Sequence, residues 1–516
     1  MVAVYATESL GRPSVKWTGD RSESFLADVH GRDHGLAARR SRLSDAGRIL
    51  AMRASIAANI GAYCSQAGPV IPWFGACMTT GAYDIPHVHV DIRMMLTNTV
   101  PVDAYRGAGR PEATYLIERL MDRARCSQVT GIDRIELRRR NFIRPERFPY
   151  TTATGRSYDS GEYAQVLDAA LQRAGWDGFA QRRDKSRQRG RLRGIGLAYY
   201  VEICSAMGGE DTHLSFTPAG HASPPWSARN PPARATKPLS RKCWRPALRG
   251  IDGAGASSIR TGNSGRVADR PGAPIVLANT MAIAGSSLYR SVERLVAAGR
   301  ETAAGIFGTT ADGVAFADGE FRDAGTNRRM TSAEGRGRVV ATSRRARPAS
   351  KPGLAGTARF EPDGGTYPNG CHVCEVEIDP ETGMVEIVRY TIEDDVGVVI
   401  NPLILEGQIV GGVAQGLGQA LTEHALYDPD SGQLISATFM DYGMPRADWM
   451  PPVDFRYREV PSPRNPLGVK GAGEAGTVGA APALVSAVLD ALPARGIEHL
   501  DMPLSPQRVW RALQAS

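Results

Sequence analysis

Three glycine-rich stretches constrain the folding of this chain more than any other feature of its sequence. They cover residues 104–112, 407–419 and 468–476. Glycine accepts positive φ angles and, having no side chain, lets the backbone approach another segment or a ligand closely. None of the stretches matches the phosphate loop of nucleotide hydrolases, and none has the strand-then-helix context of a dinucleotide fingerprint. Taken singly, each stretch indicates close backbone packing and does not identify a ligand.

Helical and strand patterns separate these stretches. Apolar residues at helical spacing over 113–140, interrupted near Gly131, predict two successive helices after the first glycine-rich loop. Residues 371–379 and 384–393 predict the two strands of a hairpin. Further helices are predicted at 163–174, 288–304, 406–421, 483–492 and 505–513, and further strands at 195–201 and 453–460. The pattern predicts two α/β units joined by a polar connection.

Positive charge is unevenly distributed along the chain. The 516 residues carry a formal net charge of +8, and basic residues gather at 182–193 and 229–249. Neither run is interleaved with stacking aromatic residues or carries a base-reading module. We interpret 182–193 as a solvated linker or surface face. A basic nucleic-acid-binding protein, held by phosphate contacts, is the alternative.

Residues 220–279 differ from the rest of the chain because apolar residues do not recur there at helical or strand spacing. No carboxylate occurs between Asp211 and Asp252, while prolines and arginines accumulate. A second arginine-rich irregular patch covers 335–350. A structureless loop as long as the first segment is unusual inside a compact domain.

The seven cysteines are odd in number and scattered, so no disulfide framework is expected. Cys371 and Cys374 have metal-like spacing, but they lie in the hairpin pattern, and no second pair completes a tetrahedral site or an iron–sulfur cluster. His87 and His89 share one face of a predicted strand and could ligate a metal in principle, but polar strand positions are the favoured interpretation. We expect no metal held by protein side chains in this chain.

The third glycine-rich stretch presents one carboxylate, Glu474, between Gly473 and the small residues Ala475 and Gly476. Such a side chain can face a cavity, and partial desolvation would raise its pKa toward values useful for a general base. A turn carboxylate or helix cap is the alternative interpretation. A single acid does not identify a reaction.

Four segments taken in order resemble one family: 105–113, 375–379 with its hairpin, 395–416 and 471–474. The family is the molybdenum-binding large subunit of the molybdenum hydroxylases, which includes xanthine dehydrogenase, aldehyde oxidase and the aerobic carbon monoxide dehydrogenases. The resemblance covers nearly the whole chain outside the two irregular patches. It implies an α+β fold of two mixed sheet-and-helix domains, residues 1–190 (N-terminally truncated) and 191–516 (including irregular segment 220–279), with the cofactor at their interface.

The same resemblance implies a molybdopterin cofactor with molybdenum, in the cytosine dinucleotide form that is frequent in bacteria. Glu474 matches the glutamate that takes a proton from a molybdenum-bound hydroxide, which then attacks an electron-poor carbon while hydride passes to a sulfido ligand. Arg106 matches a loop residue beside the substrate, with a structural ion pair as the alternative.

The residues expected to bind the cofactor share positions in the matching segments. They are Gly107, Ala108, Gly285, Ser286, Ser287, Gln408, Gln415, Gly471, Ala472 and Gly473. For the two serines a helix N-cap is the alternative, and for the two glutamines the alternative is a buried amide that packs one helix against another.

The resemblance further implies oxidation of an aldehyde or of a carbon in an N-heterocycle, with water as the oxygen donor. Electrons then leave through an iron–sulfur subunit and an FAD subunit, since this chain is expected to hold neither group. A dimer of such heterotrimers is the expected assembly.

Three departures from the family pattern qualify these expectations. Gly107 stands where copper-dependent carbon monoxide dehydrogenases carry a cysteine, whose soft thiolate binds Cu(I). Family members begin upstream of the segment that resembles 15–18 and carry there a further glycine–phenylalanine loop over the pterin. A Gly-Gln-Gly-His type motif expected within 221–278 is absent. We hypothesise that 221–278 is translated in a shifted reading frame, which leaves an inactive remnant of such a subunit as the alternative function.

The sequence also bears on location. No apolar run approaches the roughly 20 residues needed to span a bilayer. The opening residues lack the charged and apolar regions of a signal peptide. We therefore expect a cytoplasmic protein.

Overall fold

The computed structural model describes residues 8–9, 11, 16–126, 131–205, 208–215, 280–317, 319–331, 355–492 and 496–515. Its mixture of helices and sheets is the expected α+β fold. The segment 220–279 and the patch 335–350 lie outside the described residues, and so does the hypothesis of a shifted reading frame over 221–278.

The N-terminal part is built on a three-stranded sheet. β2 (His34–Leu43) pairs antiparallel with β3 (Ile49–Gly61), and β4 (His87–Leu96) pairs parallel with β3 on its other side. His87 and His89 are exposed positions of the edge strand β4. Short elements complete this part: α2 (Arg21–Ala27), β1 (His30–Gly31), α3 (Val70–Cys77), β5 (Val102–Asp103), β6 (Tyr150–Thr151) and β7 (Ser157–Tyr158).

The two helices predicted after the first glycine-rich loop are confirmed as α4 (Arg110–Cys126) and α5 (Arg134–Asn141), with Gly131 in the connection between them. The Asp133 side chain caps α5 by accepting hydrogen bonds from the backbone N–H groups of Ile135 and Glu136. Such a cap satisfies donors that the first turn of a helix leaves without partners.

A second sheet has the strand order β16-β15-β14-β8. The predicted hairpin is confirmed as β14 (Asn369–Ile378) and β15 (Val385–Asp395), while β8 (Leu192–Val201) and β16 (Val453–Arg458) flank it. All ten residues of β14 are buried. They are buried because the cluster that includes Cys371 also contains α6 (Tyr163–Ala174), and the cluster on the opposite face contains α12 (Ala475–Ala491).

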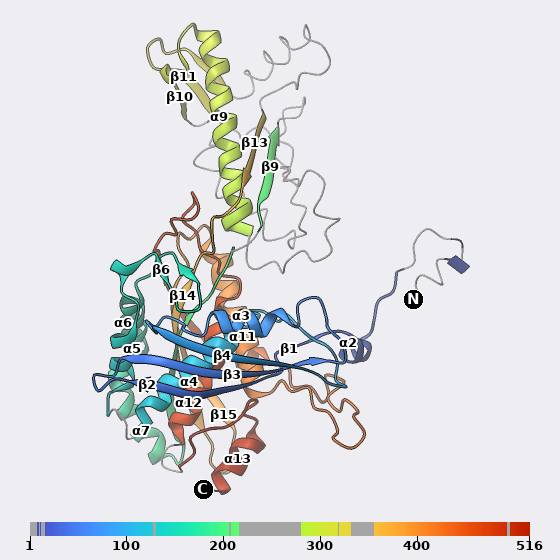
Figure 1. Ribbon diagram of the computed structural model, residues 1–516. Helices are drawn as coiled ribbons and strands as arrows, with labels where there is room; N and C mark the ends of the chain where they lie inside the picture. Colours follow the sequence, from blue (N-terminus) through green and yellow to red (C-terminus); the bar gives the residue numbers. More distant parts are fainter. Residues whose placement is uncertain are drawn as a thin grey trace.

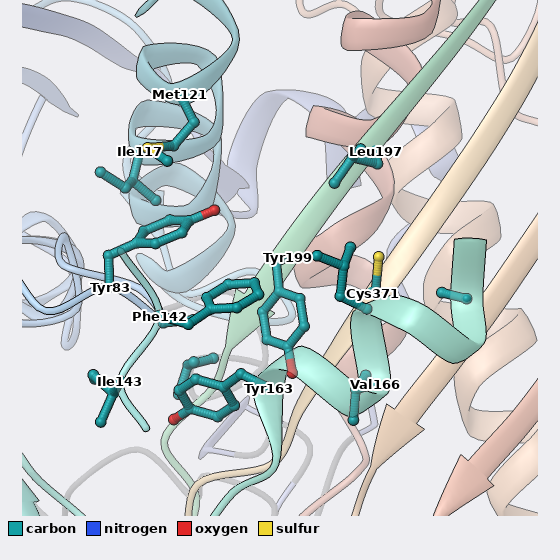
Figure 2. Close-up of a cluster of buried hydrophobic side chains, with 14 of the residues drawn as sticks. Tyr83, Ile117, Met121, Phe142, Ile143, Tyr163, Val166, Leu197, Tyr199 and Cys371 are labelled. Carbon is teal, nitrogen blue, oxygen red and sulfur yellow. The ribbon is translucent and has the colours of Figure 1, made fainter. Parts of the chain in front are cut away.

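Aromatic side chains join the two sheets. Phe142, which follows α5, stacks on Tyr83 at 5.5 Å between ring centroids and meets Tyr199 of β8 at 4.8 Å. Figure 2 shows these rings with Tyr163 and Cys371 in one buried cluster. This cluster includes residues on both sides of the boundary at 190/191, and that boundary stays a prediction.

Glycine lets α11 (Pro402–Leu421) and α12 pack closely, as predicted for the second glycine-rich stretch. A Cβ on Gly412 would lie 2.9 Å from the backbone nitrogen of Thr477, and one on Gly476 would lie 2.1 Å from the carbonyl oxygen of Ile409. Both glycines are required because the backbones themselves are in contact. The chain ends with α13 (Pro506–Gln514).

A third region projects from the two sheets (Figure 1). In it α9 (Ser286–Phe307), preceded by a π-helical turn over Thr280–Gly285, packs on the paired strands β9 (Glu210–Ser215) and β13 (Ala355–Phe360). Beyond them lies a small sheet of β10 (Val314–Ala317), β11 (Glu320–Asp323) and β12 (Arg329–Thr331).

The basic run 182–193 is not a linker, but most of its residues are exposed, as expected of a surface face. It forms most of α7 (Phe179–Gln188) and the start of β8, and three of its arginines pair with acids of β14. Arg182 and Arg193 both contact Glu375, whose side chain is 2% exposed, and Arg193 also reaches Glu377 at 2.8 Å. These carboxylates lie far from the run in the sequence, so the charge pattern alone did not reveal the pairing.

None of the helices in the described ranges is both long enough and apolar enough to cross a membrane.

Candidate active site

Two loops and one helix meet at the first and third glycine-rich stretches. The first loop connects β5 to α4 and has positive φ angles at Gly107 (99°), Ala108 (37°) and Gly109 (95°). A Cβ on Gly109 would lie 2.4 Å from the carbonyl oxygen of Ile71, so only glycine fits there. The second loop runs through Gly471 into α12, and α11 supplies the third side.

Arg106 of the first loop binds both other segments. Its Nε donates a hydrogen bond to the carbonyl oxygen of Gly473. Its Nη1 donates to Oε1 of Gln415 at 2.9 Å, and its Nη2 donates to Oε1 of Gln408 at 2.8 Å. No carboxylate among the described residues forms a salt bridge with Arg106. The structural ion pair, which was the alternative interpretation, is not formed among these residues: Arg106 binds neutral acceptors, and the negative charge of the nearby Glu474 also acts on it.

The two glutamines lie two turns apart on one face of α11 and are partly or fully exposed. They do not pack one helix against another as buried amides, which was the alternative. Their side-chain oxygens accept from Arg106, so their amide nitrogens point away from it as donors to other groups, and the Gln415 side chain also contacts Tyr105. The fold thus brings Gln408 and Gln415, two of the predicted site residues, into contact with Arg106.

Glu474 lies at the N-terminal end of α12 with its side chain 15% exposed. Its Oε1 accepts from the backbone nitrogen of Gly107 at 3.0 Å, and its Oε2 accepts from Nη2 of Arg110 at 3.1 Å. In the described part of the chain its side chain forms no capping hydrogen bond with the first turn of α12. The negative charge is nonetheless favourably placed near a helix N-terminus. Both loops therefore converge on this carboxylate.

Arg110 and Glu202 complete the centre, and sequence reasoning assigned neither a role. Nε of Arg110 donates to Oε1 of Glu202 at 2.6 Å, and its Nη1 donates to the carbonyl oxygen of Ala108 at 2.7 Å. Both side chains of the pair are 0% exposed. The sequence did contain one signal, a single acid in the apolar run 199–204. An acid that is buried with such a run needs a partner for its charge.

Burial and charge perturb the proton affinities at this centre. Burial, with the negative charge of Glu474 adding to it, raises the pKa of Glu202 to about 8 although Arg110 opposes the shift. Burial alone would lower the pKa of Arg110, but the two carboxylates raise it overall. Burial also raises the pKa of the nearby Cys204 thiol, which keeps it neutral. Ligand atoms of Glu202, Cys204 and Glu474 lie within 4.8 Å of one another. Arg110 already supplies the positive charge there, which disfavours a cation.

A buried ion pair fixes the second loop behind Glu474. Nζ of Lys470 lies 2.6 Å from Oδ2 of Asp395, and both side chains are 0% exposed. The backbone nitrogen of Lys470 donates to the carbonyl oxygen of Val396 at 2.9 Å. These contacts hold the stretch through Gly471 and Ala472 against the end of β15.

The first loop is fixed in a similar way by Arg32, whose Nη2 donates to the carbonyl oxygen of Arg106 and whose guanidinium lies 4.4 Å from the ring centroid of Tyr105. Arg32 and His34 flank Glu112, which is 7% exposed. Burial would raise the pKa of Glu112, but the contact with His34 and the charge of Arg32 lower it to about 2. These charges hold the loop at the N-terminus of α4.

Gly285, Ser286 and Ser287 lie where α9 begins. Oγ of Ser287 donates to the carbonyl oxygen of Ala358 at 2.9 Å, so this serine is committed to β13. Ser286 and Ser287 are the first two residues of α9 rather than its N-cap, which is Gly285. Gly285 faces Leu467, seven residues before Glu474, since a Cβ on it would lie 3.1 Å from Cδ1 of that leucine. This is the link between the projecting region and the second loop.

One face of the centre can receive a polar group. Within the described ranges, a Cβ on Gly407 would meet nothing within 4 Å, and one on Gly411 would meet only Nη1 of Arg106 at 3.8 Å. Together with Gln408 and Gln415 these positions form an open, side-chain-poor face of α11 that offers amide donors and a guanidinium. Such a face fits a cofactor that carries phosphate and a hydrogen-bonding ring system.

Two sequence models of protein families match this chain, and both have the same description. A sequence model described as "Molybdopterin cofactor-binding domain" matches residues 276–451, and a second model with the same description matches residues 1–142.

Curated relatives match along the whole chain. The carbon monoxide dehydrogenase large chain of Hydrogenophaga pseudoflava is 31% identical over 532 residues, covering 99% of this chain. The gamma subunit of the 6-hydroxypseudooxynicotine dehydrogenase complex of Paenarthrobacter nicotinovorans is 31% identical over 529 residues, covering all of it. The chain spans 64% of the length of each of these relatives.

Solved structures match equally well. A Cu,Mo carbon monoxide dehydrogenase superposes with a TM-score of 0.86 at 27% identity, covering 100% of this chain and 66% of the other. Quinoline 2-oxidoreductase from Pseudomonas putida 86 superposes with a TM-score of 0.86 at 28% identity, covering 99% of this chain and 65% of the other.

Proposed function

The chain belongs to the family of molybdopterin-binding large subunits of the molybdenum hydroxylases, and we propose that it oxidises an aldehyde or a carbon of an N-heterocycle with water as the oxygen donor. The observation that carries the proposal is the convergence of Arg106 and Glu474 from remote segments beside the open face of α11. Relatives and neighbours named for nicotine and quinoline support a heterocyclic carbon.

The residues around the open face would hold the cofactor. Gln408, Gln415 and the backbone of the loop through Gly471 to Gly473 offer donors and acceptors, and the cytosine dinucleotide form of molybdopterin is the form proposed. When bound, this group supplies an activated oxygen and accepts the electron pair. Gly285, Ser286 and Ser287 are proposed to approach it from the α9 side.

Glu474 is proposed as the general base. Its carboxylate is held in place by the N–H of Gly107 and by Arg110, so the atom that receives the proton is fixed relative to both loops. Positioning of a base in this way contributes about 10²–10⁴-fold to a rate. Arg106 would orient a carbonyl oxygen or ring nitrogen of the substrate.

Copper-assisted oxidation of carbon monoxide is not proposed. Position 107 is a glycine whose backbone N–H is bound to Glu474, and a Cβ there would lie 2.6 Å from Pro111. No thiolate can be presented from this position. An aldehyde or heterocycle therefore fits the loop better.

We expect the electrons to leave through other chains, because the relatives are named as a large chain and as a subunit of a complex. We propose an iron–sulfur subunit and an FAD subunit as partners, assembled as a dimer of heterotrimers. Nucleic-acid binding is not favoured, because the basic run 182–193 is paired with acids of β14.

The test is to express the full chain with its partner subunits and measure molybdenum and pterin content together with turnover of aldehydes and N-heterocycles. We expect stoichiometric molybdenum and turnover of at least one substrate class. A Glu474→Gln variant should keep its molybdenum and lose turnover. A wild-type complex that assembles without molybdenum would instead identify the chain as an inactive remnant.

A further inference from the structure

Glu202 is an acid in a place where acids are rarely found. It follows the last residue of β8 and is 0% exposed. Its Oε1 accepts from Arg110 at 2.6 Å and from the backbone nitrogen of Ile203 at 3.1 Å. Its Oε2 is buried and has no hydrogen-bond partner among the described residues. A buried carboxylate oxygen without a partner is costly unless it serves a purpose or carries a proton.

Arg110 stands between this acid and Glu474. The same guanidinium donates to Oε1 of Glu202 through Nε and to Oε2 of Glu474 through Nη2. A carboxylate atom of each acid lies within 4.8 Å of one on the other. One cation thus serves two carboxylates, and the three side chains carry a formal charge of −1 when both acids are ionised.

We propose that Glu202 is a positioning residue that sets, through the shared guanidinium of Arg110, how strongly Glu474 holds a proton. This inference rests on the proposed role of Glu474 as the base. The coupling is expected because both acids accept hydrogen bonds from the one guanidinium.

Glu202 and Glu474 share the one positive charge of Arg110. When Glu202 is ionised, it competes for the guanidinium, and Glu474 becomes the stronger base because less of the positive charge stabilises its carboxylate. When Glu202 carries a proton, the guanidinium serves Glu474 alone, and Glu474 becomes a weaker base. Burial raises the pKa of Glu202 to about 8, which places this change near neutral pH. Among the described residues, the charged and titratable groups that interact with Glu202 are Arg110 from α4, Glu474 from the start of α12, Tyr200 of β8, and Cys204 beyond β8.

The direct test is infrared titration of the protonated carboxyl band in the full-length protein. We expect a band that belongs to Glu202, titrates near neutral pH and is absent from Glu202→Gln, which keeps an oxygen acceptor for Arg110 but no charge. In Glu474→Gln the midpoint of the Glu202 band should fall by about one pH unit or more, because a negative charge a few ångströms away is removed. An unchanged midpoint in Glu474→Gln would overturn the proposal, as would a band that persists in Glu202→Gln.

The second readout is the pH profile of kcat/KM in the holoenzyme. In Glu202→Gln the guanidinium of Arg110 pairs with the charge of Glu474 alone. The acidic limb of the kcat/KM profile should therefore move to lower pH, while the molybdenum content stays constant. Glu377→Gln is the matched control, because it removes a buried carboxylate from the arginine cluster at β14 and should leave the limb in place. An acidic limb that does not move in Glu202→Gln contradicts the proposal.

The two hypotheses fail in different ways. A chain without molybdenum or turnover refutes the proposed function, whereas the infrared titration still reports whether Glu202 and Glu474 are coupled. A holoenzyme whose turnover survives in Glu474→Gln refutes the base, and an unshifted Glu202 band refutes only the coupling.

Discussion

Two clusters of arginines and carboxylates in this molecule have opposite charge balance. At β14, Glu375 is met by Arg182 and Arg193, and Glu377 by Arg189 and Arg193, so arginines outnumber acids. At the candidate active site, a single Arg110 serves the two acids Glu202 and Glu474. The first cluster gives each carboxylate two arginines, whereas the second leaves Oε2 of Glu202 without a hydrogen-bond partner among the described residues.

The difference teaches how similar side chains serve structure in one place and chemistry in another. At β14, burial alone would raise the pKa of Glu377, but a hydrogen bond from Ser186 and the charges of Arg189 and Arg193 lower it, and the arginines join α7 to the sheet. An excess of buried anions perturbs proton affinity instead, because desolvation and like charges both oppose ionisation. The predictions below separate the two clusters by size of effect.

The largest effect is expected at Glu474. Glu474→Gln should lower kcat by about 10²–10⁴-fold, since it removes the proton acceptor and keeps the size of the side chain. The measurement is steady-state turnover normalised to molybdenum content. Glu377→Gln serves as the control and should stay near the wild-type rate. Comparable losses in the two variants would remove the distinction between the clusters.

Removal of the shared cation should be the most damaging change to stability. Arg110→Met leaves Glu202 and Glu474 without their guanidinium, and breaking a buried pair in this way costs about 3–5 kcal/mol. Urea unfolding of the full chain measures the difference. If the free energy of unfolding falls by no more than the loss of an exposed surface ion pair would cost, the guanidinium is not needed to offset the two buried carboxylates.

The stability of the protein should depend on pH through Glu202. The folded-state pKa is about 8, against an ordinary value of 4.5. Between those pH values the folded protein therefore holds a proton that the unfolded chain has lost. The contribution of this proton to the free energy of unfolding is fully present below about pH 4.5 and is lost as the pH rises through 8. Glu202→Gln cannot titrate, so its unfolding free energy relative to wild type should rise by a few kcal/mol between about pH 5 and pH 8. A pH-independent difference would contradict the raised pKa.

The smallest effect is expected at β14. Arg193→Gln leaves Glu375 with Arg182 and Glu377 with Arg189, so we expect a loss of roughly 1–2 kcal/mol and no change in the pH profile of turnover. Urea unfolding and kcat/KM against pH provide both readouts. A shifted pH profile would show that the two clusters communicate.

Much of the secondary structure could be predicted from local patterns, and one element shows the limit. We predicted a helix over 483–492, but α12 begins at Ala475 and contains Pro482. Glycine, alanine and proline give a weak helical signal. The helix forms because small residues let it lie on β8: a Cβ on Gly196 would be 2.2 Å from the backbone nitrogen of Ala487. Tertiary packing outweighs propensity here.

Among the candidate site residues, the fold brings together Arg106, Glu474, Gln408 and Gln415, and it places Gly285, Ser286 and Ser287 at the start of α9. Arg110 and Glu202 were missed although both stand in or beside segments that we examined. Nothing in a linear sequence tells which acid a buried arginine will meet.

The sequence by itself determined the periodic helices, the hairpin and the glycine-rich loops, since those depend on neighbours a few residues apart. Only the tertiary structure decided that Arg110 is shared by acids 92 and 364 residues away. The physical reason is that electrostatic coupling depends on distance and desolvation in space, and both are fixed only when β8, α4 and α12 pack together.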